Sequence, residues 1–216
     1  MEDGATGERA TLNTAFFVNR RATFEVIDQP APPRRELADE MMRRKAIAGV
    51  NGGFFDSEDA PLGLRVNAGR VISPLRKAKL LTGVLVASPA QCDIVRATHF
   101  VMNAKVDAAV QCGPLLVEHG KPIAGLNDTR KARRTFAAVD GNGHSALGVS
   151  SPVSLAQLGK ILAVPDVAGN MNIVRALNLD GGSSTAFWFA SENDEVSIPA
   201  QKPVRDFVAI VPRGNL

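Results

Sequence analysis

The sequence predicts an α+β fold, with mixed or antiparallel sheets of many short strands and a few packed helices. Short apolar and β-branched runs separated by turn signals recur along most of the chain, whereas only two stretches have helical spacing. Strands and helices do not alternate regularly, which argues against repeated βαβ units. With 216 residues, 45% of them hydrophobic, the chain suits one domain around one core. Residues 1–10 are predicted to be a disordered lead-in.

The first half of the chain is predicted to hold strands around one helix. A Pro-rich linker at 29–33 precedes a helix at 34–45, whose acidic residues come early and whose basic residues come late, as the helix dipole favours. The predicted strands cover 11–18, 22–28, 47–51, 64–72 (a hairpin), 80–87 and 91–97.

The second half is predicted to be mostly strands, with one more helix. Asp140 begins a turn of the Asp-Gly type and is therefore expected to be a turn residue. Ser151 is predicted to cap a helix that has Pro152 in its first position. The predicted strands cover 108–112, 115–123 (a hairpin), 136–139, 144–150, 173–179, 185–190 and 206–211.

Two strand ends run into paired glycines. The strand at 173–179 meets Asp180-Gly181-Gly182 and then three hydroxyl residues, 183–185. The strand at 47–51 ends at Asn51-Gly52-Gly53. Paired glycines permit positive φ or a close approach of a ligand to backbone, so the two junctions could face each other across one cleft. The alternative for Asp180-Gly181 is a hairpin turn.

Composition argues against two classes of function. Aromatic residues make up 5% of the chain, with no Tyr, and the net charge of +3 is spread along it, so a nucleic-acid partner is not expected. No apolar run approaches the roughly 20 residues of a membrane span. The N-terminal residues 1–10 have no apolar core of a signal peptide.

Neither the cysteines nor the acidic residues define a metal site. Cys92 and Cys112 lack metal-ligand spacing, and two buried free thiols are favoured over one disulfide. Asp56, Glu58 and Asp59 lie in one loop, which leaves a divalent cation such as calcium as an alternative. The loop lacks the full ligand series of an EF-hand, so no metal and no cofactor is assigned.

Four short blocks occur in an order that is specific in combination. They are Val50-Asn51-Gly52-Gly53-Phe54-Phe55, then Gln111-Cys112-Gly113-Pro114-Leu115-Leu116 with Gly120, then Arg134-Thr135, and finally Asn178-Leu179-Asp180-Gly181-Gly182-Ser183-Ser184. Through these blocks the chain resembles the phosphodiester glycosidase family, from about residue 46 to residue 211.

The resemblance implies a hydrolase that cleaves a sugar from phosphate, or a related glycosidic bond. Bacterial relatives are attached to envelope or exopolysaccharide contexts, which implies a carbohydrate or sugar-phosphate substrate and a periplasmic or secreted location. The resemblance leaves the sugar, the mechanism and the oligomeric state open.

Chemistry assigns roles to residues of these blocks. Cleaving an anomeric C–O bond needs a carboxylate that activates water or attacks carbon, and Asp180 is the first candidate, with Asp56 second. Arg134 could hold phosphate with two donors; the alternative is a solvated cluster with Arg130, Lys131 and Arg133. The predicted substrate-binding residues are Asn51, Gly52, Gly53, Gly113, Thr135, Gly181, Gly182, Ser183 and Ser184.

Two other functions compete with hydrolysis. The same cleft could serve a non-catalytic carbohydrate- or phosphate-binding module, although the low aromatic content weakens that interpretation. A structural envelope protein with a decayed site is the third hypothesis. Turnover of a sugar-1-phosphodiester distinguishes the three.

Overall fold

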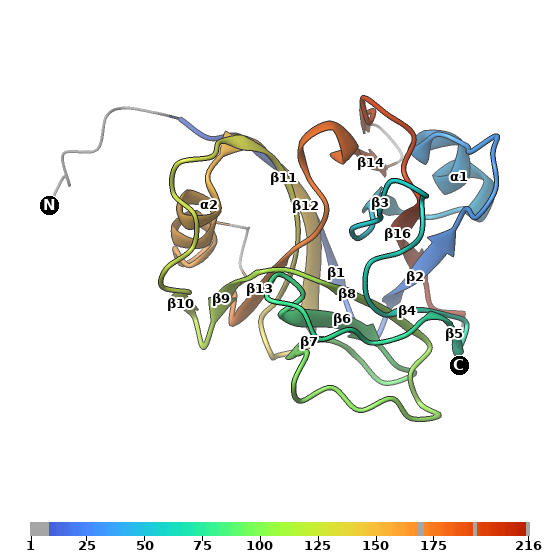
Figure 1. The fold of residues 1–216 in the computed structure, drawn as a ribbon, viewed down its shortest axis with the longest axis horizontal. Coiled ribbons are helices and arrows are strands. Elements are labelled where there is room, and N and C mark those ends of the chain that lie inside the picture. The colour runs from blue at the N-terminus through green and yellow to red at the C-terminus, as the bar shows by residue number, and fades with distance from the viewer. Residues whose placement is uncertain (1–8, 168–170, 192–193, 215–216) are drawn as a thin grey trace, which may run out of the picture.

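A computed structural model describes residues 9–167, 171–191 and 194–214. The described residues form sixteen strands, two helices and one 3₁₀ turn (Figure 1). Every strand pairing among them is antiparallel. The broad α+β prediction is confirmed, with strands far outweighing helices. Residues 1–8 of the predicted lead-in lie outside the described part of the chain.

The strands form three sheets. In spatial order, the first holds β1 (Leu12–Val18), β12 (His144–Val153), β11 (Ala132–Val139), β13 (Arg175–Asn178), β9 (Leu115–Glu118) and β10 (Lys121–Pro122). The second holds β15 (Glu195–Ile198), β14 (Phe187–Ala190), β3 (Ala48–Asn51), β16 (Asp206–Pro212) and β2 (Ala22–Asp28). The third holds β5 (Arg70–Ser73), β4 (Arg65–Asn67), β8 (Ala108–Cys112), β6 (Gly83–Ala87) and β7 (Cys92–Arg96).

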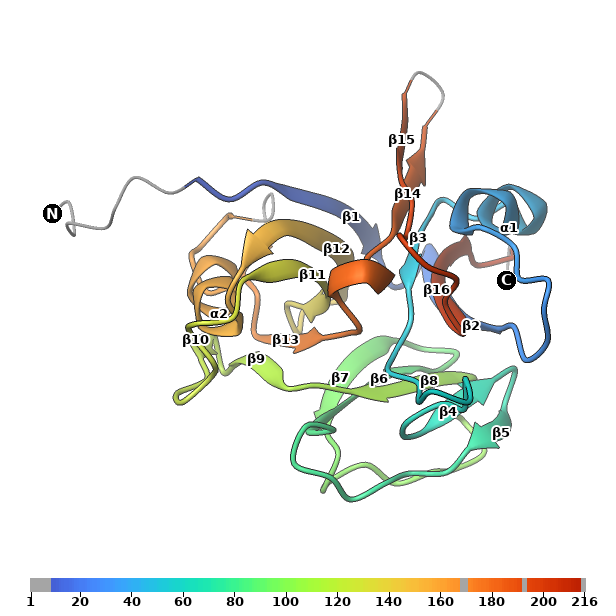
Figure 2. The ribbon, with the colours of Figure 1, turned by 45° about the horizontal axis from the view of Figure 1, so that its top comes forward.

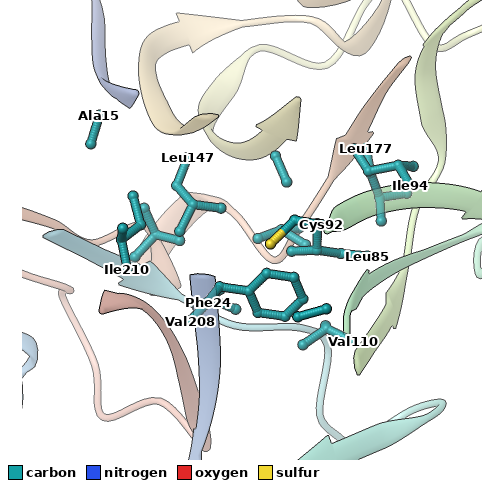
Figure 3. Packing of buried hydrophobic residues seen from close by; sticks show 14 of the residues in the cluster. Ala15, Phe24, Leu85, Cys92, Ile94, Val110, Leu147, Leu177, Val208 and Ile210 are labelled. Carbon is teal, nitrogen blue, oxygen red and sulfur yellow. The ribbon is translucent and has the colours of Figure 1, made fainter. Parts of the chain in front are cut away.

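All three sheets contribute one face to a shared apolar core. Figure 3 shows side chains of the first sheet (Leu147, Leu177), the second (Phe24, Val208) and the third (Leu85, Ile94, Val110) converging there. Burying each such side chain stabilises the fold by about 1.5–3 kcal/mol. Cys92 and Cys112 are both buried and free, which confirms the prediction of two thiols.

The helices cover the outer faces of two sheets. Helix α1 (Leu37–Arg44) packs Leu37 and Met41 in one cluster with Trp188 and Phe207 of the second sheet. Helix α2 (Leu155–Leu162) buries Leu158 and Leu162 against the first sheet. Figure 1 shows the two helices at opposite sides of the molecule. No helix among the described residues has the length and apolarity needed to cross a membrane.

The predicted start of the second helix is wrong by three residues. Strand β12 continues through Pro152 to Val153, because the Ser151 hydroxyl accepts the Thr11 N–H and Val153 pairs with Ala132. The N-cap is Ser154, whose hydroxyl accepts the Gln157 N–H at 3.0 Å while the Gln157 side chain accepts the Ser154 N–H at 2.9 Å. This reciprocal capping box satisfies the Ser154 and Gln157 N–H donors at the start of the helix.

The connection from β13 to β14 changes sheets. Strand β13 lies in the first sheet and β14 in the second, so the hairpin alternative for Asp180-Gly181 is wrong. The connection contains the 3₁₀ turn η1 (Gly182–Ser184), and β14 then pairs with β3. In Figure 2, η1 leads into β14, which projects with β15 from the body of the molecule. The crossing places Asp180 beside the end of β3.

Candidate functional site

The two glycine junctions predicted from the sequence lie directly against each other. The Asp180 N–H donates to the Gly52 carbonyl at 3.1 Å. The Asn51 side-chain amide donates to the Asp180 carbonyl at 2.8 Å. The junctions therefore meet as one hydrogen-bonded unit at the boundary of two sheets, rather than facing each other across open space.

Asn51 holds this unit together and has no capacity left for a ligand. Its Oδ1 accepts the Thr135 hydroxyl at 2.7 Å and the Ala186 N–H at 3.0 Å, while its Nδ2 donates to the Asp180 carbonyl at 2.8 Å and the Gly52 carbonyl at 3.5 Å. Asn51 and Thr135 are both fully buried. Both are predicted to bind substrate; in the structure they lie buried beneath the Asp180 junction, where Asn51 bonds to the Asp180 carbonyl and to Thr135.

Gly52 and Gly53 lie on a buried ion pair that was not predicted. A Cβ on Gly52 would lie 1.8 Å from Asp206 Oδ1, and one on Gly53 would lie 2.0 Å from Arg65 Nη2. Asp206 Oδ1 accepts the Gly53 N–H at 2.9 Å, and Asp206 Oδ2 accepts Arg65 Nε at 2.6 Å. Only glycine allows the backbone to approach the pair this closely.

Arg65 and Asp206 were not predicted, because no local sequence motif distinguishes them. They are 141 positions apart, and Arg65 stands in an ordinary strand pattern. The Arg65 guanidinium also donates to the carbonyls of Leu64, Gln111 and Phe54 at 2.9, 3.0 and 3.1 Å. A buried charge needs such full pairing, and removing one partner typically costs about 3–5 kcal/mol.

A cleft of about 360 Å³ opens beside the glycine junction that contains Asp180. Its lining residues come from six segments: Phe54, Leu80, Gly113, Pro114, Asn127, Arg130, Ala132, Arg134, Leu155, Asn178, Asp180, Gly181 and Gly182. Gly113 lets the Leu80 segment close in, since a Cβ there would lie 2.1 Å from the Leu80 carbonyl oxygen. Asp180 is the only acidic residue among these described lining residues.

Asp180 is a carboxylate in a poorly solvated place. Burial raises its pKa, and the nearby Asp206 charge adds to the rise. The Ser184 hydroxyl, the Gly181 N–H and the Lys202 charge oppose it. The Gly181 N–H donates to Asp180 Oδ1 at 2.8 Å, whereas Ser184 lies beside the carboxylate without full hydrogen-bond geometry. No cation forms an ion pair with Asp180 among the described residues.

The Arg134 guanidinium donates to backbone carbonyls and to no carboxylate among the described residues. Its Nε donates to the Val153 carbonyl at 3.1 Å and its Nη2 to the Arg130 carbonyl at 2.6 Å. Burial and the Arg130 charge both lower its pKa. Nη1 forms no bond within the described residues, so this fixed guanidinium can bind an anion in the cleft.

Asn178 is a lining residue that the site prediction omitted. Its Nδ2 donates to the Gly113 carbonyl at 2.9 Å and to the Leu179 carbonyl at 2.7 Å. Its Oδ1 is buried and has no partner among the described residues. An unpaired buried acceptor costs about 1–3 kcal/mol. The Asn178-Leu179-Asp180 motif was a usable signal for this residue.

Three other predicted residues lie at different places. Asp56 lies in an exposed turn outside the cleft lining, where its Oδ1 accepts the Glu58 and Ala60 N–H groups at 2.9 Å each. Ser183 is exposed and is not a lining residue. Gly182 lines the cleft with φ of +65°, a conformation that favours glycine. Within the described ranges, no three His, Cys, Asp or Glu side chains converge as a metal site.

Solved structures share this fold. The catalytic domain of zebrafish N-acetylglucosamine-1-phosphodiester alpha-N-acetylglucosaminidase, auto-inhibited by its pro-peptide, matches 94% of this chain and 84% of its own, with 14% identity and a TM-score of 0.67. A hypothetical protein from Synechocystis matches 94% of this chain and 59% of its own, with 17% identity and a TM-score of 0.60. At these identities the likeness shows the fold alone.

Two further comparisons bear on the family. A Burkholderia pseudomallei K96243 protein thought to be exported matches 93% of this chain and 74% of its own, with 14% identity and a TM-score of 0.65. A search of curated proteins finds no match. The family model described as phosphodiester glycosidase matches residues 44–211, which include both glycine junctions, Arg134 and Asp206. The chain therefore belongs to the phosphodiester glycosidase family.

Proposed function

We propose that this protein hydrolyses the bond between a sugar and a phosphate in a sugar-1-phosphodiester. Membership of the phosphodiester glycosidase family supports this reaction class. The similar zebrafish domain is named for cleaving an N-acetylglucosamine-1-phosphodiester, which makes that sugar the first one to test here.

The observation that carries the proposal is a cleft with one carboxylate and two arginines. Asp180 is the only acid among the described lining residues, while Arg130 and Arg134 line the same space. An ordinary glycosidase needs a second carboxyl group to protonate the leaving oxygen. A phosphate ester is already a good leaving group, so neutralising its charge can replace protonation.

The proposed step uses these residues in separate roles. Arg134 holds the phosphate oxygens. Asp180 either takes a proton from the attacking water or attacks the anomeric carbon itself. In the overall reaction the anomeric C–O bond breaks, water supplies the new hydroxyl, and the phosphate leaves as a monoester. Asn51, Thr135, Gly52 and Gly53 keep the Asp180 backbone in place.

The physiological setting is part of the proposal. A resembling protein of Burkholderia pseudomallei is thought to be exported, which supports a periplasmic or secreted location. We accordingly place the substrate in envelope or exopolysaccharide material.

The decisive experiment compares two leaving groups on the same sugars. The protein is offered a panel of chromogenic sugar-1-phosphodiesters and the matching aryl glycosides, which contain no phosphate. We expect turnover of at least one phosphodiester and a much lower kcat/KM for its aryl glycoside. Saturable binding without turnover across the panel would identify a binding module instead, and faster cleavage of the aryl glycosides would contradict the role of phosphate.

A further inference from the structure

Two basic segments border the cleft. Residues 76–79, between β5 and β6, carry Arg76, Lys77 and Lys79 and lead directly to Leu80, a lining residue that is 64% exposed. Residues 130–134 lead into β11, and Arg130 and Arg134 of this segment line the cleft. Arg133 contacts a lining residue, with its Nη2 donating to the Gly182 carbonyl at 3.4 Å.

Six cations of these segments have no acidic partner among the described residues. Within the part of the chain that the structure describes, Arg76, Lys77, Lys79, Arg130, Arg133 and Arg134 form no ion pair. Eight other arginines do pair with carboxylates: Arg34, Arg35, Arg43, Arg44, Arg65, Arg96, Arg175 and Arg205. Unpaired like charges around a concave site create a positive potential that attracts anions.

The first segment is anchored rather than loose. The buried Gln111 side chain accepts the Arg76 N–H at 2.9 Å and donates to the Arg76 carbonyl at 2.7 Å. It also donates to the Leu81 carbonyl at 3.1 Å. Both ends of the segment are thereby tied to β8 beside Gly113. Its three charged residues therefore stand on an anchored backbone that leads into the lining residue Leu80.

We propose that the substrate is a polyanionic glycan, which carries negative charge beyond the phosphate at the bond that is cleaved. This inference rests on the proposed function. One phosphodiester needs the guanidinium of Arg134, whereas the five further unpaired cations can attract additional negative charges of a polymer. Those charges are either further phosphodiesters or carboxylates of acidic sugars. A nucleic acid fits less well, because Phe54 is the only aromatic lining residue for stacking bases.

The kinetic test compares a short and a long substrate. The short one is the methyl diester of N-acetylglucosamine 1-phosphate, and the long one is a trimer of that sugar joined by 1-phosphodiesters. The variant Lys77→Gln/Lys79→Gln removes two charges of the first segment. Its control, Lys105→Gln/Lys160→Gln, removes two exposed charges that are not lining residues of the cleft.

We expect the first variant to lower kcat/KM on the trimer by about tenfold at low salt, with a clearly smaller loss on the methyl diester. In about 1 M salt, where the Debye length is about 3 Å, the difference should disappear. The control variant should match the wild type on both substrates. Equal losses in the two variants, or equal losses on the two substrates, would overturn the proposal.

A binding test separates this inference from the proposed reaction. Asp180→Asn protein is titrated with the trimer, with trigalacturonate and with a thymidine oligonucleotide of equal charge. Tightest binding of the trimer assigns the extra charges to phosphate, and equal or tighter binding of trigalacturonate assigns them to carboxylate. Tightest binding of the oligonucleotide would overturn the glycan assignment. If the wild type turns over neither substrate, the proposed reaction is wrong. The titration still shows which class of polyanion the protein binds.

Discussion

Two Asp-Gly corners end neighbouring strands of the first sheet and differ in almost every physical respect. Asp140 follows β11 and Asp180 follows the end of β13, and the two strands are antiparallel, so the corners lie at opposite ends of the pair. Asp140 closes a hairpin, as predicted, and leads back into β12. Asp180 leads out of its sheet into another one.

The surroundings of the two carboxylates set their pKa values in opposite directions. Asp140 is buried, which raises its pKa, but the N–H groups of His144 and Asn142 and the His144 ring outweigh burial and leave it lowered. The three bonds measure 3.0, 2.7 and 2.6 Å. Asp180 has one such N–H bond and keeps a raised pKa. A satisfied carboxylate stabilises a turn, whereas an under-satisfied one beside a cleft remains available for chemistry.

The largest expected difference between the corners is in activity. Asp180→Asn should lower kcat by about 10²–10⁴-fold, the usual range for losing a positioned acid–base group. Asp140→Asn should leave the rate within a factor of a few, because that corner lies outside the cleft lining. Steady-state turnover of the best phosphodiester measures both. Comparable losses in the two variants would mean that Asp180 acts through the fold.

The arginines near the two corners provide the second test. Arg134 has no acidic partner among the described residues, whereas Arg175 pairs with Asp93 at 3.2 Å. Arg134→Lys should lose roughly 1.5–3 kcal/mol of transition-state binding, or about one to two decades in kcat/KM, on phosphodiesters. The loss should be much smaller on an aryl glycoside. Arg175→Lys is the control, and an equal loss there would remove Arg134 from the site.

The pH dependence of the rate provides the third test. The raised pKa of Asp180 means that the carboxylate ionises at a higher pH than an ordinary aspartate, whose pKa is 3.8. If the ionised form acts, kcat/KM should fall on the acid side with an apparent pKa above 3.8. The Asp140→Asn variant should show the same fall of kcat/KM on the acid side. A limb at or below the ordinary value would show that Asp180 does not control the rate.

Stability should respond to pH with opposite signs at the two corners. The lowered pKa of Asp140 contributes stability that is present above its unfolded pKa and is lost as pH falls through the folded value. The raised pKa of Asp180 means that its ionisation weakens folding as pH rises. Urea denaturation near neutral pH should therefore find Asp140→Asn destabilised and Asp180→Asn not destabilised. In acid the Asp140 difference should vanish; a pH-independent difference would exclude ionisation as its cause.

The smallest effect concerns the glycines of the corners. Gly182 and Gly141 have φ of +65° and +75°. A Cβ added at Gly182 would meet nothing within 4 Å, and one at Gly141 would lie 4.0 Å from Val174 Cγ2. Substituting Ala at either should therefore cost about 1–2 kcal/mol of stability, from backbone conformation alone. Only Gly182→Ala should also weaken turnover, since Gly182 lines the cleft. Unchanged stability in both variants, measured by urea denaturation, would show that the turns adopt another backbone conformation without cost.

Local residue patterns by themselves determined much of the fold and the location of the site. Alternating apolar residues and turn signals marked most strands, and the paired glycines marked the two junctions of the candidate site, because these features depend on a few neighbouring residues. The predicted start of helix α2 was wrong because the local sequence allows a helix to begin at Ser151-Pro152 or at Ser154. Pairing of β12 with β1 and β11 selected the later one.

Only the tertiary structure decided which polar residues line the candidate cleft. Asn51 and Thr135 look available in sequence, yet the sheet boundary buries them and saturates the bonds of Asn51. Asp140-Gly141 and Asp180-Gly181 look alike in sequence, yet one closes a hairpin and the other crosses between sheets. The Arg65–Asp206 pair joins residues 141 positions apart. Burial, pairing and pKa depend on atoms brought together from distant segments, and no local pattern carries that information.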